Sequence, residues 1–415
     1  MKVNSTIKTA LEKGPIGIYL MAFVIPLYQK FLGIAVMIII VEFLIRNIVL
    51  KREIEKPKLS WKNPNVWMFL FYFMHVVGLF HTENMKFANL DLGMKSTLAI
   101  FPVLFLFYRP RVNWSFFVKA FVGGALLSIA INLSISLNLY LEDSQFSHFY
   151  DSRFTHLMHR GYWAVYLCIA VFFLFKVGLK EETIKQKILP FFLAVLIMVF
   201  TLLSLSKMGL IILGVLVVWL LIKVIQGFQS KWVLPISIVL LVGGTYSIYS
   251  FTPVVKHRMD AMFSTLGRPI SEYNMERPGS TGSRVLVWHS SVELIKENFW
   301  TGVGTGDIKD ELVQRNFDNG YIHVAEKNLN SHNQFLNSHI ALGVLGPFFL
   351  LMIILSNCIR RSFDPYYSWR VGIVFMLFLA MLTESMLEVE AGIVPYAFLL
   401  TFLTSFKEPQ ELSKE

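Results

Sequence analysis

The stretch MGLIILGVLVVWLLIKVI, residues 208–225, contains one charged side chain, Lys223. As an α-helix it would be about 27 Å long at ~1.5 Å per residue, close to the ~30 Å hydrocarbon core of a bilayer. Similar apolar runs recur along the chain, and their length and scarcity of charge are typical of transmembrane helices. The sequence therefore predicts an all-α polytopic membrane protein.

The composition of the chain agrees with this prediction. Of its 415 residues, 55% are hydrophobic and only 16% are charged, whereas a soluble protein carries about 25% charged residues. The mean hydropathy is +0.56. The two cysteines, Cys168 and Cys358, lie in or beside apolar segments, so we predict neither a disulfide framework nor a metal cluster.

The apolar runs predict about twelve transmembrane helices. They lie at residues 15–28, 31–50, 64–80, 96–108, 114–138, 161–178, 188–204, 208–225, 232–250, 334–357, 369–385 and 390–406. The chain then has three parts: 1–250 with spans 1–9, a large hydrophilic loop at 251–333, and 334–415 with spans 10–12 and a tail. The first helix precedes no small-residue cleavage site, so we expect it to remain as an anchor.

The distribution of lysine and arginine predicts the orientation in the membrane. The formal net charge is +10, and basic residues gather in alternate short loops, such as 51–62, 176–187 and 360–370. Cytoplasmic loops of membrane proteins are enriched in Lys and Arg. We therefore expect both termini in the cytoplasm and the large loop on the outer side, and the positive charge requires no nucleic-acid partner.

The large loop contains a predicted amphipathic helix. Residues 279–283 read GSTGS, a turn with several helix N-cap candidates. Apolar side chains then recur at spacings of three and four, which is typical of a helix lying on the membrane surface or on the bundle. They are Val285, Trp288, Val292, Ile295 and Phe299. The GVGTG that follows at 302–306 predicts a flexible turn; without a preceding strand it is no dinucleotide-binding motif.

A histidine marks the end of the large loop. His332 and Asn333 are followed by nine residues and then by Gly343 and Gly346. A histidine at such a boundary can simply bond water or backbone, but a neutral imidazole also suits proton removal near pH 7. Asn330 and Asn333 could orient the ring or bind hydroxyl groups, and the two glycines would allow close helix packing.

Three basic residues are candidates for binding an anion. Arg284 begins the amphipathic helix, as either a surface charge or a forked donor to phosphate. Arg160 stands at the outer edge of a span, where it either snorkels or belongs to an anion site. Its neighbours in an outer-face basic cluster are Arg153, His156 and His159. Lys207 separates two apolar runs, as either a turn residue or a second phosphate-facing cation.

Three glutamates, Glu384, Glu388 and Glu390, lie in the last outer loop. Carboxylates at a membrane edge could bind a cation or sugar hydroxyls. Because charged loop side chains are usually exposed, we expect these three to be solvated.

The order of these residues resembles a known family, the O-antigen ligase superfamily. This superfamily also contains O-antigen polymerases and bacterial O-linked oligosaccharyltransferases. Its ligase signature of His, a polar residue, nine residues, Gly, two residues and a further Gly fits His332, Asn333, Gly343 and Gly346. The stretch from Arg284 and Trp288 to the 302–306 turn is similar to the Arg, Trp and Gly-x-Gly segment of that family, whereas Lys207 stands where an arginine is common.

The resemblance implies a membrane glycosyltransferase of the GT-C type that needs no metal and no cofactor. Such a ligase moves a glycan from undecaprenyl diphosphate to lipid A-core on the periplasmic face of the bacterial inner membrane. His332 would then be the base that activates the acceptor hydroxyl. Arg284, Arg160 and Lys207 would hold the diphosphate and stabilise the leaving group, and the anomeric centre would be inverted.

Other functions remain as alternatives. An O-antigen polymerase uses the same donor but a second undecaprenyl-linked unit as acceptor. A protein O-oligosaccharyltransferase often has a larger C-terminal periplasmic region. This sequence ends soon after its last predicted span, which favours the ligase over that alternative. From a different class, a lipid or sugar transporter would place ionisable residues in mid-membrane, and a non-catalytic scaffold would use the loop for docking. The sequence predicts no oligomeric state.

Overall fold

The computed structural model describes residues 15–50, 59–227, 268–360 and 364–406, with isolated positions at 243, 250, 256, 260, 264 and 265. Within these residues every regular element is a helix, and none of them forms a β-strand. The prediction of an all-α chain is confirmed for this part.

Most of the predicted spans coincide with helices. The helices are α2 Ile16–Val24, α3 Leu32–Leu50, α4 Pro64–Val77, α5 Met85–Lys95, α6 Thr97–Phe107, α7 Trp114–Asp143, α8 Arg160–Lys180, α9 Ile184–Leu203, α10 Lys207–Gly227, α13 Gly279–Glu297, α14 Ile308–Asp318, α15 Ile322–Glu326, α16 Gln334–Leu342, α17 Leu345–Cys358, α18 Tyr367–Thr383 and α19 Glu390–Phe402. The predicted span 232–250 falls outside the described residues, apart from two isolated positions.

Among the described residues, five helical segments are long and apolar enough to cross a membrane. They are Met85–Phe107, which joins α5 and α6, and the helices α7, α8, α9 and α10. The helices α17, α18 and α19 are apolar but shorter. By length and composition the chain is therefore consistent with a membrane protein, while the count of twelve spans stays a prediction.

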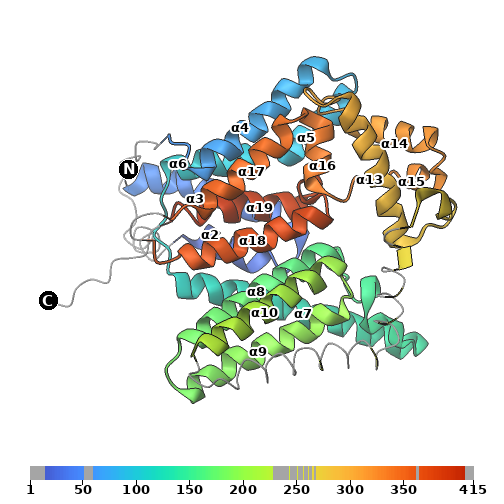
Figure 1. The fold of residues 1–415 in the computed structure, drawn as a ribbon. Coiled ribbons are helices and arrows are strands. Elements are labelled where there is room, and N and C mark those ends of the chain that lie inside the picture. The colour runs from blue at the N-terminus through green and yellow to red at the C-terminus, as the bar shows by residue number, and fades with distance from the viewer. Residues whose placement is uncertain are drawn as a thin grey trace.

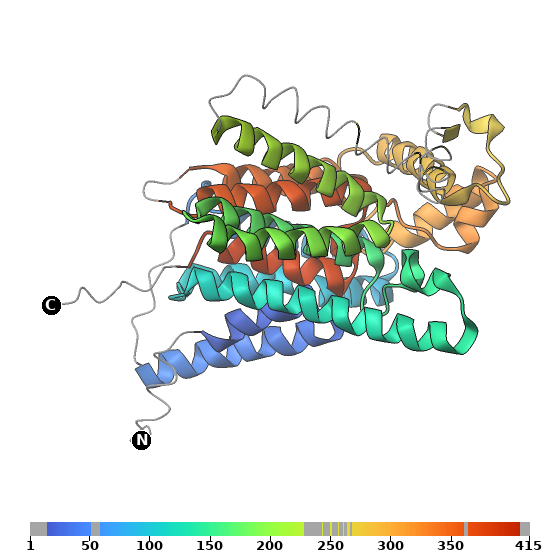
Figure 2. The same ribbon diagram turned by 90° about the horizontal axis from the view of Figure 1, so that it is seen from below.

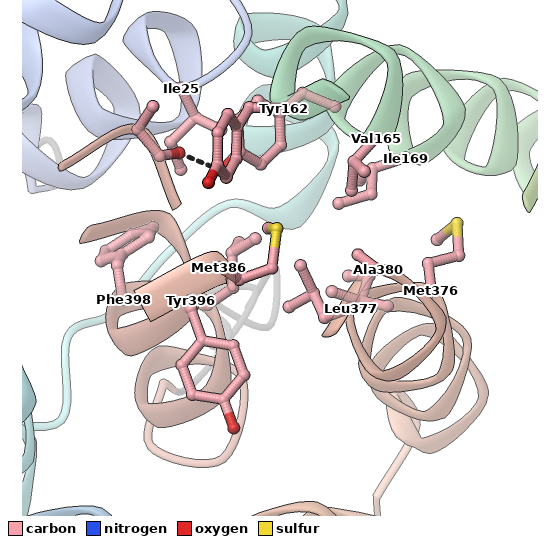
Figure 3. Close-up of a cluster of buried hydrophobic side chains, with 14 of the residues drawn as sticks. Ile25, Tyr162, Val165, Ile169, Met376, Leu377, Ala380, Met386, Tyr396 and Phe398 are labelled. Atoms are coloured by element: carbon pink, nitrogen blue, oxygen red, sulfur yellow. Dashed lines mark hydrogen bonds between the residues drawn. The ribbon is translucent and has the colours of Figure 1, made fainter. Parts of the chain in front are cut away.

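Helix α8 forms the centre of the bundle. In its most apolar window 83% of the residues are buried, against 17% for the neighbouring α9, so α8 packs on protein while α9 presents most of its surface outward. Figure 3 shows Val165 and Ile169 of α8 pointing toward Leu377 and Ala380 of α18. Helix α8 begins at Arg160, directly after its N-cap residue His159.

The helices of the large loop lie together at one end of the bundle. Figures 1 and 2 show α13, α14 and α15 beyond the ends of the long helices, and the C-terminal end of α7 reaches the same end. A turn at 302–306 joins α13 to α14, and its Asp307 accepts hydrogen bonds from the backbone N–H of Glu83 and Asn84. The loop is thus attached to the bundle and forms its cap.

The predicted apolar stripe of α13 is wrong in register. Val292 is 40% and Phe299 41% exposed, and the other three members of the stripe are only half-buried. The buried stripe consists of Gly282, Ser283, Leu286, Val287, Ser290, Ser291 and Leu294. Buried Ser283 and Ser291 donate hydrogen bonds to the helix backbone one turn back. A pattern search that uses hydrophobicity alone does not recognise such serines as core residues.

The predicted span 334–357 is broken into α16 and α17 at Gly343. The backbone of Gly343 has φ +59° and ψ −153°, a combination found essentially only in glycine. The turn after α13 packs against this break: the N–H groups of Val303 and Gly304 donate to the carbonyls of Ile340 (2.8 Å) and Ala341 (3.1 Å). The two glycine motifs of the sequence therefore form one close-packed joint.

We expect Gly343→Ala to disrupt this joint. A Cβ at position 343 would overlap the backbone carbonyl of Trp300, and its φ is unfavourable for alanine. The free energy of unfolding should fall by about 2–4 kcal/mol, measured by thermal unfolding in detergent. Gly214→Ala is the matched control, because a Cβ there has no neighbour within 4 Å. Equal melting temperatures of the two variants would contradict the proposed joint.

Candidate active site

The predicted site residues come together around one cavity of about 530 Å³ at the capped end of the bundle. His332, Arg284, Arg160 and Lys207 all line it, although they are up to 172 positions apart in the chain. The full lining consists of His159, Arg160, Gly161, Ser206, Lys207, Met208, Arg277, Gly279, Ser280, Ser283, Arg284, His323, Lys327, Leu329, His332 and Glu384. The cavity is therefore lined by basic and histidine side chains from both the bundle and the large loop.

His332 is paired with the carboxylate of Glu384, which we expected to be solvated. Nδ1 of His332 lies 2.8 Å from Oε1 of Glu384. Glu384 is only 8% exposed, so the expectation that it is a solvated loop acid is wrong. With Nδ1 engaged by a carboxylate, the neutral ring carries its proton on Nδ1 and leaves Nε2 as the acceptor.

Glu384 also lies close to Arg284. Its Oε2 is 3.4 Å from Nη2 of Arg284. Burial by itself raises the pKa of Glu384, but the hydrogen bond and charge of His332, followed by the charge of Arg284, lower it below its ordinary value. Glu384 is therefore a carboxylate at neutral pH and joins the histidine to the arginine.

The backbone at His332 is held in the left-handed region. Its φ is +44°, a strained value for a residue with a Cβ that surrounding contacts must maintain. The N–H of His332 donates to Oδ1 of Asn330 (3.0 Å), and Nε1 of Trp288 donates to the carbonyl of Ser331 (2.8 Å). Asn333 caps α16 by accepting from two backbone N–H groups. Both asparagines bond the backbone rather than the ring, and Trp288 supports the turn.

A buried serine pair connects this turn to the loop that carries Glu384. Oγ of Ser331 lies 3.3 Å from Oγ of Ser385, and both side chains are fully buried. His332 directly follows Ser331, and Glu384 directly precedes Ser385. The side chains of His332 and Glu384 meet in the cavity. The serine pair thus fixes the spacing of the two segments.

The other two glutamates of the last loop are also bonded to protein. Glu388 pairs with fully buried Lys95 (Nζ to Oε2, 2.9 Å) and accepts from Gln334 (3.2 Å). Lys95 in turn pairs with Asp91 on the same helix. Glu390 is exposed, but it accepts a hydrogen bond from the N–H of Gly33 (3.1 Å). The prediction of solvated acids is therefore wrong for Glu388 as well.

Arg160 and Lys207 stand at the first positions of α8 and α10. Arg160 forms an ion pair with Asp151, and Nζ of Lys207 donates to Oγ1 of Thr281 (2.6 Å). Helix N-termini carry a partial positive charge, and α13 also begins at the cavity, with Gly279 in its lining. Three helix starts and three cations converge here, an arrangement that favours an anion.

Only part of the predicted basic cluster reaches the cavity. His159 lines it and caps α8 by accepting from the N–H of Gly161 (3.3 Å). Burial lowers the pKa of His159, and the charges of His332 and Arg284 lower it further against the opposing effect of Glu384. Arg153 instead bonds Ser147, and His156 lies 3.4 Å from Ser136. Neither of these two is part of the lining.

Comparison with known proteins gives a family match for part of the chain. Residues 191–352 match a protein family described as O-Antigen ligase. The resemblance to the O-antigen ligase superfamily is confirmed. The match contains Lys207, Arg284, His332 and both glycines of the 343–346 segment. No curated protein matches the chain.

The matched region supplies most of the cavity, but two parts of the site lie outside it. Arg160 precedes the match and Glu384 follows it. In the described part of the chain, no group of three His, Cys, Asp or Glu side chains could hold a metal ion. The expectation of a reaction without metal or cofactor stays a prediction.

We expect Glu384→Gln to slow a reaction that depends on His332 without changing the shape of the cavity. A glutamine would keep the size of the side chain but remove the negative charge that fixes the tautomer, so turnover should fall on the order of 10²-fold. Glu390→Gln is the control. An unchanged rate in Glu384→Gln would contradict a function for the pair.

The same variant should change the response of stability to acid. Because the pKa of Glu384 is lower in the folded protein, its carboxylate stabilises the fold above the unfolded pKa of about 4.3. That contribution is lost as the pH falls through the folded pKa. Between about pH 5 and about pH 3 the melting temperature of wild type should therefore fall more than that of Glu384→Gln. Parallel pH curves would contradict this assignment.

Proposed function

We propose that the protein, in this cavity, transfers a glycan from undecaprenyl diphosphate to a sugar hydroxyl of lipid A-core or a similar acceptor. The observation that carries this proposal is that the His332–Glu384 pair lines the same cavity as Arg284, Arg160 and Lys207. A proton acceptor close to a set of phosphate-binding cations is what such a transfer needs. The O-antigen ligase match supports the general class of activity.

In the proposed reaction, the acceptor hydroxyl oxygen attacks the anomeric carbon while Nε2 of His332 takes its proton. The bond from the anomeric carbon to the diphosphate oxygen breaks, and undecaprenyl diphosphate leaves with the electron pair. Arg284, Arg160 and Lys207 meet the charge that develops on it. Attack opposite the leaving group inverts the anomeric centre, and a diphosphate leaves without a strong acid.

Glu384 would hold and stabilise the histidine during this step. The imidazolium that forms at His332 lies 2.8 Å from the carboxylate of Glu384. An ionised partner strengthens such a hydrogen bond. The proton then passes to solvent after the product leaves, which restores the pair for the next turnover.

We place this cavity on the periplasmic side of a bacterial inner membrane, with twelve spans and both termini in the cytoplasm. Support comes from the basic residues of the alternate short loops and from the position of α13–α15 beyond the long helices. In this arrangement residues 251–333 are a periplasmic loop between spans 1–9 and spans 10–12. Both lipid-linked substrates would reach the cavity from the outer leaflet.

A reconstituted transfer reaction tests the proposal. Purified protein in nanodiscs is mixed with undecaprenyl-diphosphate glycan and lipid A-core, without divalent metal, and the products are separated on a gel. Glycan on the lipid A-core supports the ligase. Lengthening of the lipid-linked glycan instead would make the protein an O-antigen polymerase. Neither product from folded protein would contradict both and favour a transporter or a scaffold.

A further inference from the structure

The mouth of the cavity has three further basic side chains that the proposed reaction does not use. They are Arg277, which precedes α13, and His323 and Lys327 of α15 and its C-cap. Arg277 and Lys327 are exposed, and His323 is half-buried. All three come from the large loop, whereas Arg160 and Lys207 come from the bundle.

Fixed segments of backbone present these side chains. Oδ1 of Asn274 accepts from the N–H of Arg277 (2.9 Å), and the buried Tyr273 anchors the turn by donating to the carbonyl of Thr265 (2.7 Å). Helix α15 is anchored by Val324 and Ala325, which are almost fully buried. The positions of Arg277, His323 and Lys327 are therefore built into the loop.

The charges of these residues are not balanced within the described part of the protein. Arg284 has Glu384 and Arg160 has Asp151, but no described carboxylate lies within ion-pair distance of Arg277, His323 or Lys327. The cavity lining contains five Lys and Arg side chains and a single carboxylate, Glu384. Concentrated charge of one sign attracts a ligand of the opposite sign.

A diphosphate alone does not account for all of this charge. In the proposed reaction its oxygens must lie beside Arg284, next to the histidine that activates the acceptor. A volume of about 530 Å³ is within the usual range for a small-molecule site, roughly 300–1,000 Å³. Space for sugar therefore remains between the diphosphate and the mouth.

We propose that Arg277, His323 and Lys327 bind an anionic group, a phosphate or a carboxylate, on the glycan of one of the two substrates. The inference rests on the proposed function, because it places the sugar in the same cavity. An arginine with two neighbouring N–H donors is suited to such an oxyanion. The protein would thereby select a charged glycan over a neutral one.

A binding experiment tests the subsite without requiring turnover. Full-length protein in nanodiscs is saturated with inorganic pyrophosphate and titrated with glucose 6-phosphate or with glucose by calorimetry. Wild type should bind glucose 6-phosphate and not glucose. Arg277→Gln combined with Lys327→Gln should weaken glucose 6-phosphate binding about tenfold or more and leave pyrophosphate binding unchanged. Lys309→Gln, on the exposed surface of α14, is the matched control.

Several results would overturn the subsite. Competition between pyrophosphate and glucose 6-phosphate would show one site instead of two. Equal binding of glucose and glucose 6-phosphate would show no recognition of charge. Equal binding of glucose 6-phosphate by wild type and the double variant would show that Arg277 and Lys327 do not form the subsite. Failure of wild type to transfer glycan would contradict the proposed function but would leave these binding results intact.

The transfer reaction then identifies which substrate carries the anion. The double variant is compared with wild type using acceptors with and without phosphate groups, and donors with and without a uronic acid. A higher KM confined to the phosphorylated acceptor assigns the subsite to the acceptor. One confined to the uronic acid donor assigns it to the donor. An unchanged KM in both arms would overturn the proposal.

Discussion

The His332→Ala variant should transfer glycan on the order of 10²–10⁴ times more slowly than wild type, the range that a positioned general base contributes. The acceptor hydroxyl would lose the proton acceptor that Glu384 orients in the cavity. Binding of the donor should change little, because the cations of the cavity remain. The measurement is the initial rate in nanodiscs at saturating donor, together with pyrophosphate binding by calorimetry.

His148→Ala is the matched control for that variant. His148 also pairs with a carboxylate, Asp143 (2.7 Å), but it lies in the segment between α7 and α8 and is not part of the cavity lining. Its rate should equal that of wild type. A His332→Ala protein that binds pyrophosphate normally and still turns over at the wild-type rate would show that another group takes the proton.

Residues of the candidate site could be predicted from the sequence where they have a local signature. His332 ends a long polar segment and is followed by two glycines at fixed spacing, so its neighbourhood in the chain was informative. Arg284 was similarly marked by its position near the start of a helix. The structure brings both to one cavity, which the sequence alone could not show.

Glu384 could not be predicted as part of the candidate site because its pairing with His332 is a contact across 52 positions of sequence. In the sequence it is one of three similar glutamates in a short loop. Its distinction arises from burial beside Ser385 and from the return of α18 to the end of the bundle.

The helical elements were predicted more completely than the breaks between them. Long apolar runs determine helices such as α7 and α10 through composition alone. The interruption at Gly343 depends on a tertiary contact with the turn after α13, so an apolar run across 334–357 concealed it. The same reason explains the register of α13, whose buried serines satisfy their hydroxyl groups within the helix.

Replacement of Arg284 should have the second large effect. Arg284→Ala is expected to lower kcat/KM for transfer about 10²–10³-fold, as for removal of one donor to a developing negative charge. Arg284→Lys keeps the charge but loses the planar fork, so it should recover only part of the rate. Both variants should also weaken pyrophosphate binding, which His332→Ala should not.

The control for Arg284 must remove an arginine of the same loop without altering the cavity. Arg315→Ala meets this requirement, because Arg315 pairs with Glu297 on the surface between α13 and α14 and does not line the cavity. A loss in Arg284→Ala that Arg284→Lys restores completely would show that charge alone matters there. A variant with normal pyrophosphate binding and normal kcat/KM would remove Arg284 from the site. Because Arg284 also contacts Glu384, a changed pH profile without weaker pyrophosphate binding would instead assign it to positioning the histidine pair.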